Sequence, residues 1–381
     1  MNKYLFLVIK IFIVLAFSVF VLSLSGCEDK HEKDDEPIVS PDRDCDYDEN
    51  CDADEDDDGD AYVDDDDTDD NDTDTDIIDT DDDTDANTDA NTDTDINEDP
   101  CQATNAEKIN SVVIGTYNTR LFFDKVCDSE NCSSSSFESV PNDSEYNAKV
   151  SDLADSVKEI GADIILLQEV EKESCLKDLF EKSGDYDEYY LGEKGSVASV
   201  DTGVMTKGKI TYKNKHIEQI DCADCEDGKT TFSRAFLETH IELGCREIIV
   251  FSAHFKSKAD DDAPRRLAEA AAAVKILKKT AEKYPDALIV MGGDLNDEPG
   301  SDTLDFFESE QSFLRVADEL SSKDQATYLY HGNAIALDHI FWVKNESGTY
   351  KKGSAKVVKD APSIYSLGSS DHAALKATFE F

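Results

Sequence analysis

The sequence has 381 residues and a formal net charge of −50, and this charge is distributed unevenly along the chain. Residues 28–100 carry a net charge of −34, whereas residues 101–381 hold 50 acidic and 32 basic side chains, a net of −18. The C-terminal part therefore lacks the broad basic surface of proteins that bind nucleic acid tightly without sequence preference.

The first 27 residues predict export and attachment to a lipid. Residues 11–24 are apolar or small, and the run ends at Gly26 and Cys27. This pattern resembles a bacterial lipoprotein signal peptide, in which Cys27 is lipidated, and Glu28 after the cysteine favours the outer membrane or cell surface. The alternative is an uncleaved transmembrane anchor, because the apolar run nearly spans a bilayer. Both interpretations put residues 28–381 outside the cytoplasmic membrane, in the cell envelope.

Residues 28–100 predict a disordered, Asp-rich tether. Like charges repel one another and few apolar residues are present to offset chain entropy. A flexible chain of this length reaches roughly 50 Å, and its charge extends it further. Within it, residues 52–60 resemble an Asp-rich calcium loop. The alternative is a chance match, which so dense an Asp tract makes easily.

Nine cysteines besides Cys27 predict disulfides in an oxidising compartment. The short spacings favour local pairs, whereas Cys101, Cys175 and Cys245 have no obvious partner; the candidate pairs are Cys45 with Cys51, Cys127 with Cys132, and Cys222 with Cys225. The last pair could also be half a zinc site or a redox pair, but no second ligand pair accompanies it. We therefore expect a structural disulfide there.

Residues 101–381 form one catalytic domain in this interpretation. Short apolar runs predict strands at 111–117, 163–169, 200–206, 234–243, 247–255, 287–295, 335–343 and 373–381. Amphipathic patterns predict helices at 147–160 and 265–284, the second closed by Pro285. Some strands follow one another directly and others are separated by helices, which indicates a layered α/β (α+β) fold with mixed sheets.

Polar side chains stand where these apolar runs begin or end. A single carboxylate after a strand is usually a turn or cap residue. Here carboxylates, amides and histidines recur at strand ends: Asn118, Glu169, His254, Asp294 with Asn296, Asp338, and Asp371 with His372. A layered sheet can gather such ends into one cleft. Carboxylates that hold a divalent metal, with a histidine or aspartate to activate water, suit phosphodiester hydrolysis.

Six motifs have the order and spacing of the endonuclease/exonuclease/phosphatase superfamily, which includes deoxyribonuclease I-like enzymes. The resemblance covers residues 109–381, and its motifs are Thr-Tyr-Asn at 116–118, Leu-Gln-Glu at 167–169, Ala-His-Phe-Lys-Ser at 253–257, Gly-Gly-Asp-Leu-Asn at 292–296, Leu-Asp-His-Ile at 337–340 and Ser-Asp-His-Ala at 370–373. The fold it implies is a four-layer sandwich of two mixed β-sheets flanked by helices.

The resemblance also implies a role for each strand-end residue. Glu169 resembles the metal ligand, with Asn118 beside it and Asp371 as a further metal contact. Asp294 and Asn296 resemble the pair that handles the nucleophilic water and holds the scissile phosphate. The remaining assignments are His372 as the catalytic histidine, Asp338 as the carboxylate that orients it, His254 as a second catalytic histidine, and Arg234 with Asn118 as contacts to substrate phosphate.

The motifs leave the carboxylate partner of His254 open, and Asp201 is our candidate. His216, His240 and His331 are expected to be ordinary surface or core histidines, and His339 a neighbour of Asp338 only.

The sequence thus predicts an extracytoplasmic phosphodiesterase that depends on Mg²⁺, with Mn²⁺ or Ca²⁺ as alternatives. We expect a monomeric nuclease that hydrolyses DNA or RNA and is held at a membrane by its N-terminal lipid. One alternative is the same chemistry on a lipid or inositol phosphate, as in sphingomyelinases, since the superfamily reuses one site for many substrates. A second is a non-catalytic calcium-dependent binding lipoprotein, with Ca²⁺ in the acidic tether.

Overall fold

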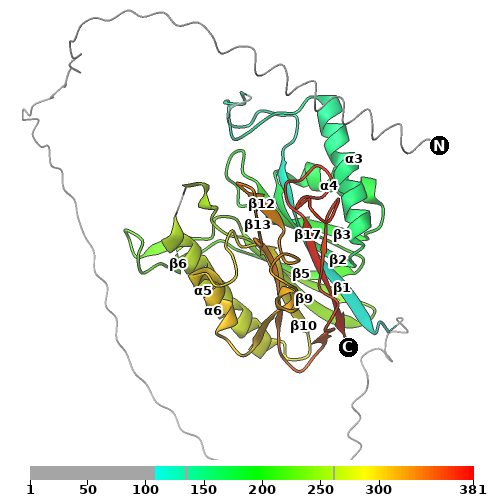
Figure 1. The fold of residues 1–381 in the computed structure, drawn as a ribbon, viewed down its shortest axis with the longest axis vertical. Helices are drawn as coiled ribbons and strands as arrows, with labels where there is room; N and C mark the ends of the chain where they lie inside the picture. The colour runs from blue at the N-terminus through cyan, green and yellow to red at the C-terminus, as the bar shows by residue number, and fades with distance from the viewer. Residues whose placement is uncertain (1–107, 134–135, 261) are drawn as a thin grey trace, which may run out of the picture. The chain divides into compact units, whose positions relative to one another are not determined.

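The computed structural model describes residues 108–133, 136–260 and 262–381 (Figure 1). Cys27 with its predicted lipid, the predicted tether and the calcium-like loop lie outside these residues, so those assignments stay predictions. Within the described ranges, no helix is both long and apolar enough to cross a membrane.

Two mixed β-sheets form the centre of the fold. The first has the order β15-β17-β1-β2-β4-β3, with β16 also paired to β17. Its strands are β1 (Ser111–Phe122), β2 (Ile164–Val170), β3 (Glu188–Leu191), β4 (Asp201–Thr206), β15 (Thr349–Tyr350), β16 (Lys356–Val358) and β17 (Ala374–Glu380). β1 runs parallel to β2, and both have antiparallel partners on their other sides.

The second sheet has the order β11-β14-β10-β9-β8-β5. Its strands are β5 (Lys209–His216), β8 (Phe236–Leu243), β9 (Arg246–His254), β10 (Leu288–Asp294), β11 (Phe313–Arg315) and β14 (Asp338–Val343). β9 and β10 are parallel, whereas β14 is antiparallel to β10. Two small hairpins stand apart from the sheets, β6 (Gln219–Asp221) with β7 (Lys229–Thr231) and β12 (Tyr328–Tyr330) with β13 (Asn333–Ile335).

The sheets pack face to face through alternate residues of their strands. Leu166 of β2 and Val250 of β9 belong to one buried cluster that joins the two sheets. Their neighbours Leu167 and Phe251 belong to two other clusters, one on the outer face of each sheet. Both faces of the central strands are buried. This agrees with their sequences, which are continuous apolar runs and do not alternate between apolar and polar residues.

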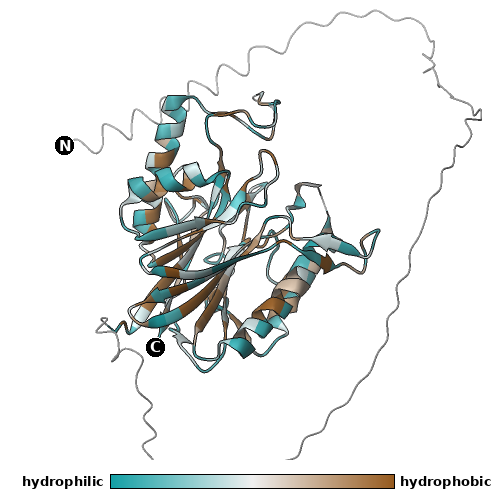
Figure 2. Cartoon of the chain, turned by 180° about the vertical axis from the view of Figure 1, so that it is seen from behind, coloured by the Kyte–Doolittle hydropathy of each residue, from teal (hydrophilic) through white to brown (hydrophobic). Residues whose placement is uncertain are grey.

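Helices cover the two outer faces and complete four layers (Figure 1). They are α3 (Asp143–Ile160) and α4 (Glu173–Ser183) on the first sheet, and α5 (Ala263–Lys283) and α6 (Asp302–Glu308) on the second. Two 3-10 turns, η1 (Lys258–Asp260) and η2 (Val316–Glu319), stand outside these helical layers. α3 begins at a capping box between Asn142 and Glu145 and ends at Gly161 in the left-handed conformation. α5 packs through a face rich in alanine, and its exposed positions include Lys275, Lys279 and Glu282. Hydrophobic and hydrophilic residues alternate along the helices in Figure 2.

The predicted fold class, two mixed sheets between layers of helices, is confirmed. The apolar pattern of the sequence did not predict α4 or the edge strand β5. The residues of these two elements are mostly polar or half exposed. The disulfides Cys127–Cys132 and Cys222–Cys225 form as expected, and Cys245 is also disulfide-bonded. Cys175 is a buried free thiol.

Candidate active site

Sheet register brings the strand-end residues to one end of the sandwich. Parallel pairing aligns the carboxyl ends of β1 and β2, with Asn118 beside Gln168, and likewise of β9 and β10, with Asp294 beside His254. On the other side of β10, Asp294 faces Asp338 at the start of β14.

A local irregularity in the first sheet orients Glu169. The pairing of β2 with both β1 and β4 shifts register around this residue, and Glu169 has a left-handed backbone (φ 62°). Such a bulge breaks strand alternation and redirects a side chain. The Glu169 carboxylate accepts hydrogen bonds from Asn118 Nδ2 at 3.2 Å and from the Leu121 amide at 2.7 Å. Backbone strain here is the kind that functional sites store.

Close strand approach in the second sheet positions Asp294. A Cβ on the preceding Gly293 would lie 1.9 Å from the Ala253 carbonyl oxygen of β9. Only glycine therefore allows β10 to pair here with β9 and to carry Asp294 next to His254.

The Asp294 carboxylate lies at the centre of the site. Asn118 Nδ2 donates to Asp294 Oδ2 at 3.0 Å, and the same oxygen lies 3.7 Å from His254 Nε2 and 4.0 Å from His372 Nε2. The Asn296 amide donates to Asp294 Oδ1 at 2.8 Å. Burial raises the pKa of Asp294 to about 7, so the group can exchange a proton near neutral pH.

Asp338 and His372 form a buried pair. His372 Nδ1 donates to Asp338 Oδ2 at 2.8 Å, and the Tyr328 ring packs 4.7 Å from the imidazole, centroid to centroid. Burial by itself lowers the pKa of His372, but the charge and hydrogen bond of Asp338 outweigh it and raise the pKa to about 10. The imidazole is therefore protonated at neutral pH. Its other nitrogen, Nε2, lies 4.0 Å from Asp294 Oδ2.

His254 is buried, and its pKa is shifted in the opposite direction to that of His372. Burial, with the nearby charges of Arg234 and His372, holds the pKa of His254 well below its usual value. His254 Nε2 lies 3.9 Å from Glu169 Oε1, and Nδ1 has no hydrogen-bond partner among the described residues.

Asp201 is not the partner of His254, so that candidate assignment is wrong. Its carboxylate accepts from Ser199 Oγ at 2.8 Å and from the Lys194 amide at 3.3 Å instead. Sequence order could not show this, because the contacts of Asp201 and of His254 depend on how the ends of β4 and β9 pack in the folded chain.

The other predicted residues border this centre. Asn296 Nδ2 donates to the Phe255 carbonyl at 3.1 Å, and Arg234 Nε donates to the Val200 carbonyl at 3.3 Å. Asp371 pairs with Arg120, at 3.4 Å between Oδ2 and Nε.

The oxygen donors fit a hard divalent cation. Glu169 and Asp371 supply carboxylates that are 18% and 35% exposed, and Asn118 supplies an amide. Mg²⁺ prefers such sites, with one or two carboxylates and retained waters. Asp294, Asp338 and His372 also have ligand atoms within 4.8 Å of one another, but the imidazole of His372 is already bonded to Asp338.

Two residues near the site, Lys149 and Arg120, were not among the predicted site residues. Lys149 of α3 donates to the Ser369 carbonyl at 2.9 Å, and burial lowers its pKa to about 8. Lys149 and Arg120 line a cavity of about 310 Å³ together with Phe123 and Tyr146. No local signal marks Lys149 within a helix, whereas Arg120 stands two residues after Asn118 and could have been noted.

Glu269 of α5 was also missed. Its fully buried carboxylate accepts from the Ser233 amide at 2.5 Å and the Lys256 amide at 2.6 Å. It thereby ties the loop that carries Arg234 to the segment that follows His254. His339, which was expected to have no catalytic role, is buried, and its Nε2 lies 2.9 Å from the Asp297 carbonyl oxygen. His216 and His240 each hydrogen-bond the Glu238 carboxylate at 2.8 Å.

Comparison with known proteins shows which family the chain resembles. A family model described as the Endonuclease/Exonuclease/phosphatase family matches residues 113–368. No curated protein sequence matches the chain. Among solved structures, an endonuclease/exonuclease/phosphatase from Beutenbergia cavernae is 13% identical with a TM-score of 0.50, covering 72% of each chain.

Two further solved structures are similar at comparable levels. One from Bacteroides vulgatus is 17% identical with a TM-score of 0.49, over 72% of this chain and all of that one. Truncated TDP2 from Caenorhabditis elegans is 16% identical with a TM-score of 0.48, over 71% of this chain and 98% of that one. At such identities the likeness concerns the fold alone.

Proposed function

The chain belongs to the endonuclease/exonuclease/phosphatase family, and from that premise we propose that it hydrolyses the phosphodiester bonds of DNA or RNA outside the cytoplasm, using a divalent metal. The observation that carries the proposal is the gathering of two buried carboxylates and two buried histidines at one end of the sheets. These groups are Asp294, Asp338, His254 and His372.

Glu169, Asn118 and Asp371 are the residues that would hold the metal, with Mg²⁺ as our first choice and Mn²⁺ or Ca²⁺ as alternatives. When bound, such an ion neutralises the non-bridging oxygens of a phosphodiester and the charge that develops on its leaving group.

The acid and base roles follow from the pKa values of Asp294 and His372, which their different surroundings separate. Asp294 is suited to accept the proton of an attacking water, because its buried carboxyl has a pKa of about 7. His372 is protonated at that pH and is suited to donate from Nε2 to the leaving oxygen, while Asp338 holds Nδ1. Proton transfer by positioned groups of this kind contributes about 10²–10⁴ in rate.

Fixed donors are suited to bind the phosphate as its charge grows. His254 is neutral and offers one N–H, and Asn296 offers its amide. Arg234 supplies a guanidinium near His254, whose pKa its charge lowers. Arg234 and these donors would meet the phosphate locally, within a domain that is acidic as a whole.

A nucleic-acid substrate is favoured by the cavity beside the metal ligands. Arg120 and Lys149 supply two cations there, beside Glu145, whereas the rings of Phe123 and Tyr146 that complete the lining are buried. Cations that line a groove bind the phosphates of single strands. TDP2 from D. rerio has been crystallised with a single strand DNA product, but at 15% identity and a TM-score of 0.49 that structure carries no weight for the substrate of this chain.

The test is hydrolysis by the purified chain of plasmid DNA, RNA, sphingomyelin and an artificial phosphodiester, with Mg²⁺ or EDTA. We expect cleavage of DNA or RNA that EDTA abolishes and that Glu169→Gln lacks. Turnover of sphingomyelin alone would support the lipid-phosphate alternative. No hydrolysis of any substrate would support the binding lipoprotein and overturn the proposal.

The cell-envelope location is tested separately, at Cys27. In cells fed a labelled fatty acid, the chain should take up label and fractionate with membranes, and Cys27→Ser should remove the label. An unlabelled wild-type chain would instead support the transmembrane-anchor alternative.

A further inference from the structure

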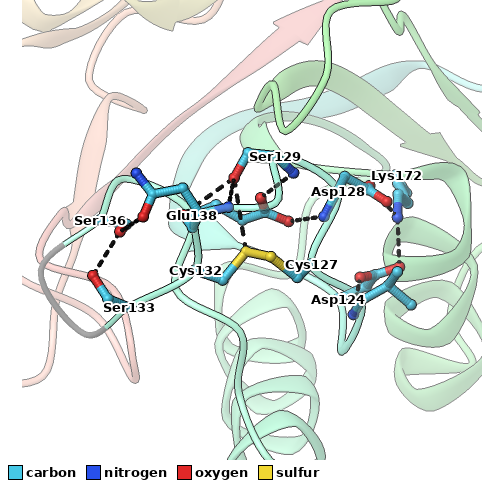
Figure 3. The surroundings of a disulfide bond; sticks show 11 residues. Asp124, Cys127, Asp128, Ser129, Cys132, Ser133, Ser136, Glu138 and Lys172 are labelled. Atoms are coloured by element: carbon cyan, nitrogen blue, oxygen red, sulfur yellow. Dashed lines mark hydrogen bonds and ion pairs between the residues drawn. A yellow bond between two sulfur atoms is a disulfide. The ribbon is translucent and has the colours of Figure 1, made fainter.

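A second group of carboxylates lies where the loop between β1 and α3 meets the end of β2, apart from the centre around Asp294. Asp128, Glu138 and Glu171 each place an oxygen within 4.8 Å of the others'. The Cys127–Cys132 disulfide lies beside Asp128 and Glu138 in this loop (Figure 3). Glu138 and Glu171 are 2% and 4% exposed, so two of the three carboxylates are removed from water.

Hydrogen bonds occupy some of these oxygens and leave one without a partner. Glu138 accepts from the amides of Asp128 and Ser129, both at 2.7 Å. Glu171 Oε2 accepts from the Asp124 amide at 2.6 Å. Glu171 Oε1 is buried with no hydrogen-bond partner among the described residues. A buried carboxylate oxygen without a partner is costly, which calls for an unseen cation or proton.

The cation already present does not balance the group. Lys172 is paired with Asp124 at 2.9 Å and with Asp128. With Glu138 and Glu171, these four carboxylates and one ammonium leave a formal charge of −3 if all are ionised.

From this geometry we propose that Asp128, Glu138 and Glu171 bind a structural Ca²⁺ ion. Oxygen ligands at 2.3–2.6 Å from Ca²⁺ are at most about 5 Å apart, in keeping with the observed spacing. Waters would complete the coordination from a cavity of about 310 Å³ that Asp128 and Glu171 line. Zinc is disfavoured, because the nearby sulfurs of Cys127 and Cys132 are bonded to each other and no histidine joins the group.

The position of the site indicates what the ion does. Glu171 follows Glu169 by two residues, and its backbone amide donates to the Phe122 carbonyl at 3.1 Å. The same loop joins β1, which carries Asn118, to α3, which carries Lys149. A calcium ion there would hold this loop against the ends of β1 and β2.

The test is the thermal unfolding of the full chain in metal-free buffer and in 10 mM CaCl₂, without Mg²⁺ or substrate. For a dissociation constant well below 1 mM we expect the Tm to rise by roughly 5 °C. The rise should vanish in Glu171→Gln and in Asp128→Asn, a milder change at a partly exposed position. Asp143→Asn is the matched control, because its exposed carboxylate pairs with Lys125 outside the group.

An equal rise in wild type and both site variants would assign the calcium effect to the tether or the metal site at Glu169 and overturn the proposal. No rise in wild type would also overturn it, and would make a proton or Lys172 the counter-charge of Glu171. Because the readout is unfolding without substrate, neither result depends on the proposed nuclease activity.

Discussion

Asp338 and His372 should behave as one functional unit, and a double-mutant cycle tests this. Both side chains are buried, and a single 2.8 Å hydrogen bond joins Nδ1 to Oδ2. In Asp338→Asn the negative charge is lost while the shape is kept, so the ring loses the group that orients it and holds its proton. In His372→Ala the proton donor itself is lost.

The expected magnitude follows from the proton-transfer role. Each single variant should lose about a hundredfold in turnover, or roughly 2.7 kcal/mol of transition-state stabilisation. Independent residues would lose about ten-thousandfold together, whereas a unit should lose little more than His372→Ala alone. The predicted coupling is therefore about 2.7 kcal/mol, far above the error of such cycles.

The assay is single-turnover hydrolysis at saturating Mg²⁺ with wild type, both singles, the double, and His331→Ala as an exposed-histidine control. Multiplicative losses would mean that the two residues act independently. A near-normal His372→Ala would refute the catalytic assignment itself.

The same pair makes a stability prediction for the metal-free chain. The pKa of His372 is raised to about 10 in the folded state. A raised histidine pKa contributes stability that is complete below the unfolded value, about 6.5, and is lost as pH rises through the folded value. The free energy of unfolding in EDTA should thus decline between pH 7 and 10, and Asp338→Asn should flatten this decline. Parallel curves for both chains would contradict the assigned interaction.

Three other changes have definite expected outcomes. Glu169→Gln should lower turnover at least about a hundredfold with an unchanged circular dichroism spectrum, since it removes the metal-binding charge; near-wild-type turnover in an Mg²⁺ titration would disprove that role. Gly293→Ala should lower the free energy of unfolding by about 3 kcal/mol in urea, because its Cβ would meet the Ala253 oxygen, and an unchanged midpoint would rule out the close approach. Deleting residues 28–100 should leave turnover unchanged if they are a spacer, whereas a large loss would show that the segment contributes to the folded enzyme.

Local pattern was enough to predict the layered fold, the helices α3 and α5, and the motifs that identify the family. Apolar runs, caps and Pro285 act within a few residues of themselves, so they can be read along the chain. The polar residues at strand ends were visible for the same reason. The elements missed, such as β5, are stable only because they pair with a neighbour that lies elsewhere in the sequence.

Only the tertiary structure decided which of those residues meet. Asp294 and His254 are neighbours because β9 and β10 pair in one register. Asp201 is excluded because its carboxylate bonds Ser199 and the Lys194 amide instead. The bulge that orients Glu169 depends on two partner strands at once. Contacts between segments tens to hundreds of residues apart depend on sheet register and side-chain packing, and no local pattern in the sequence specifies either one.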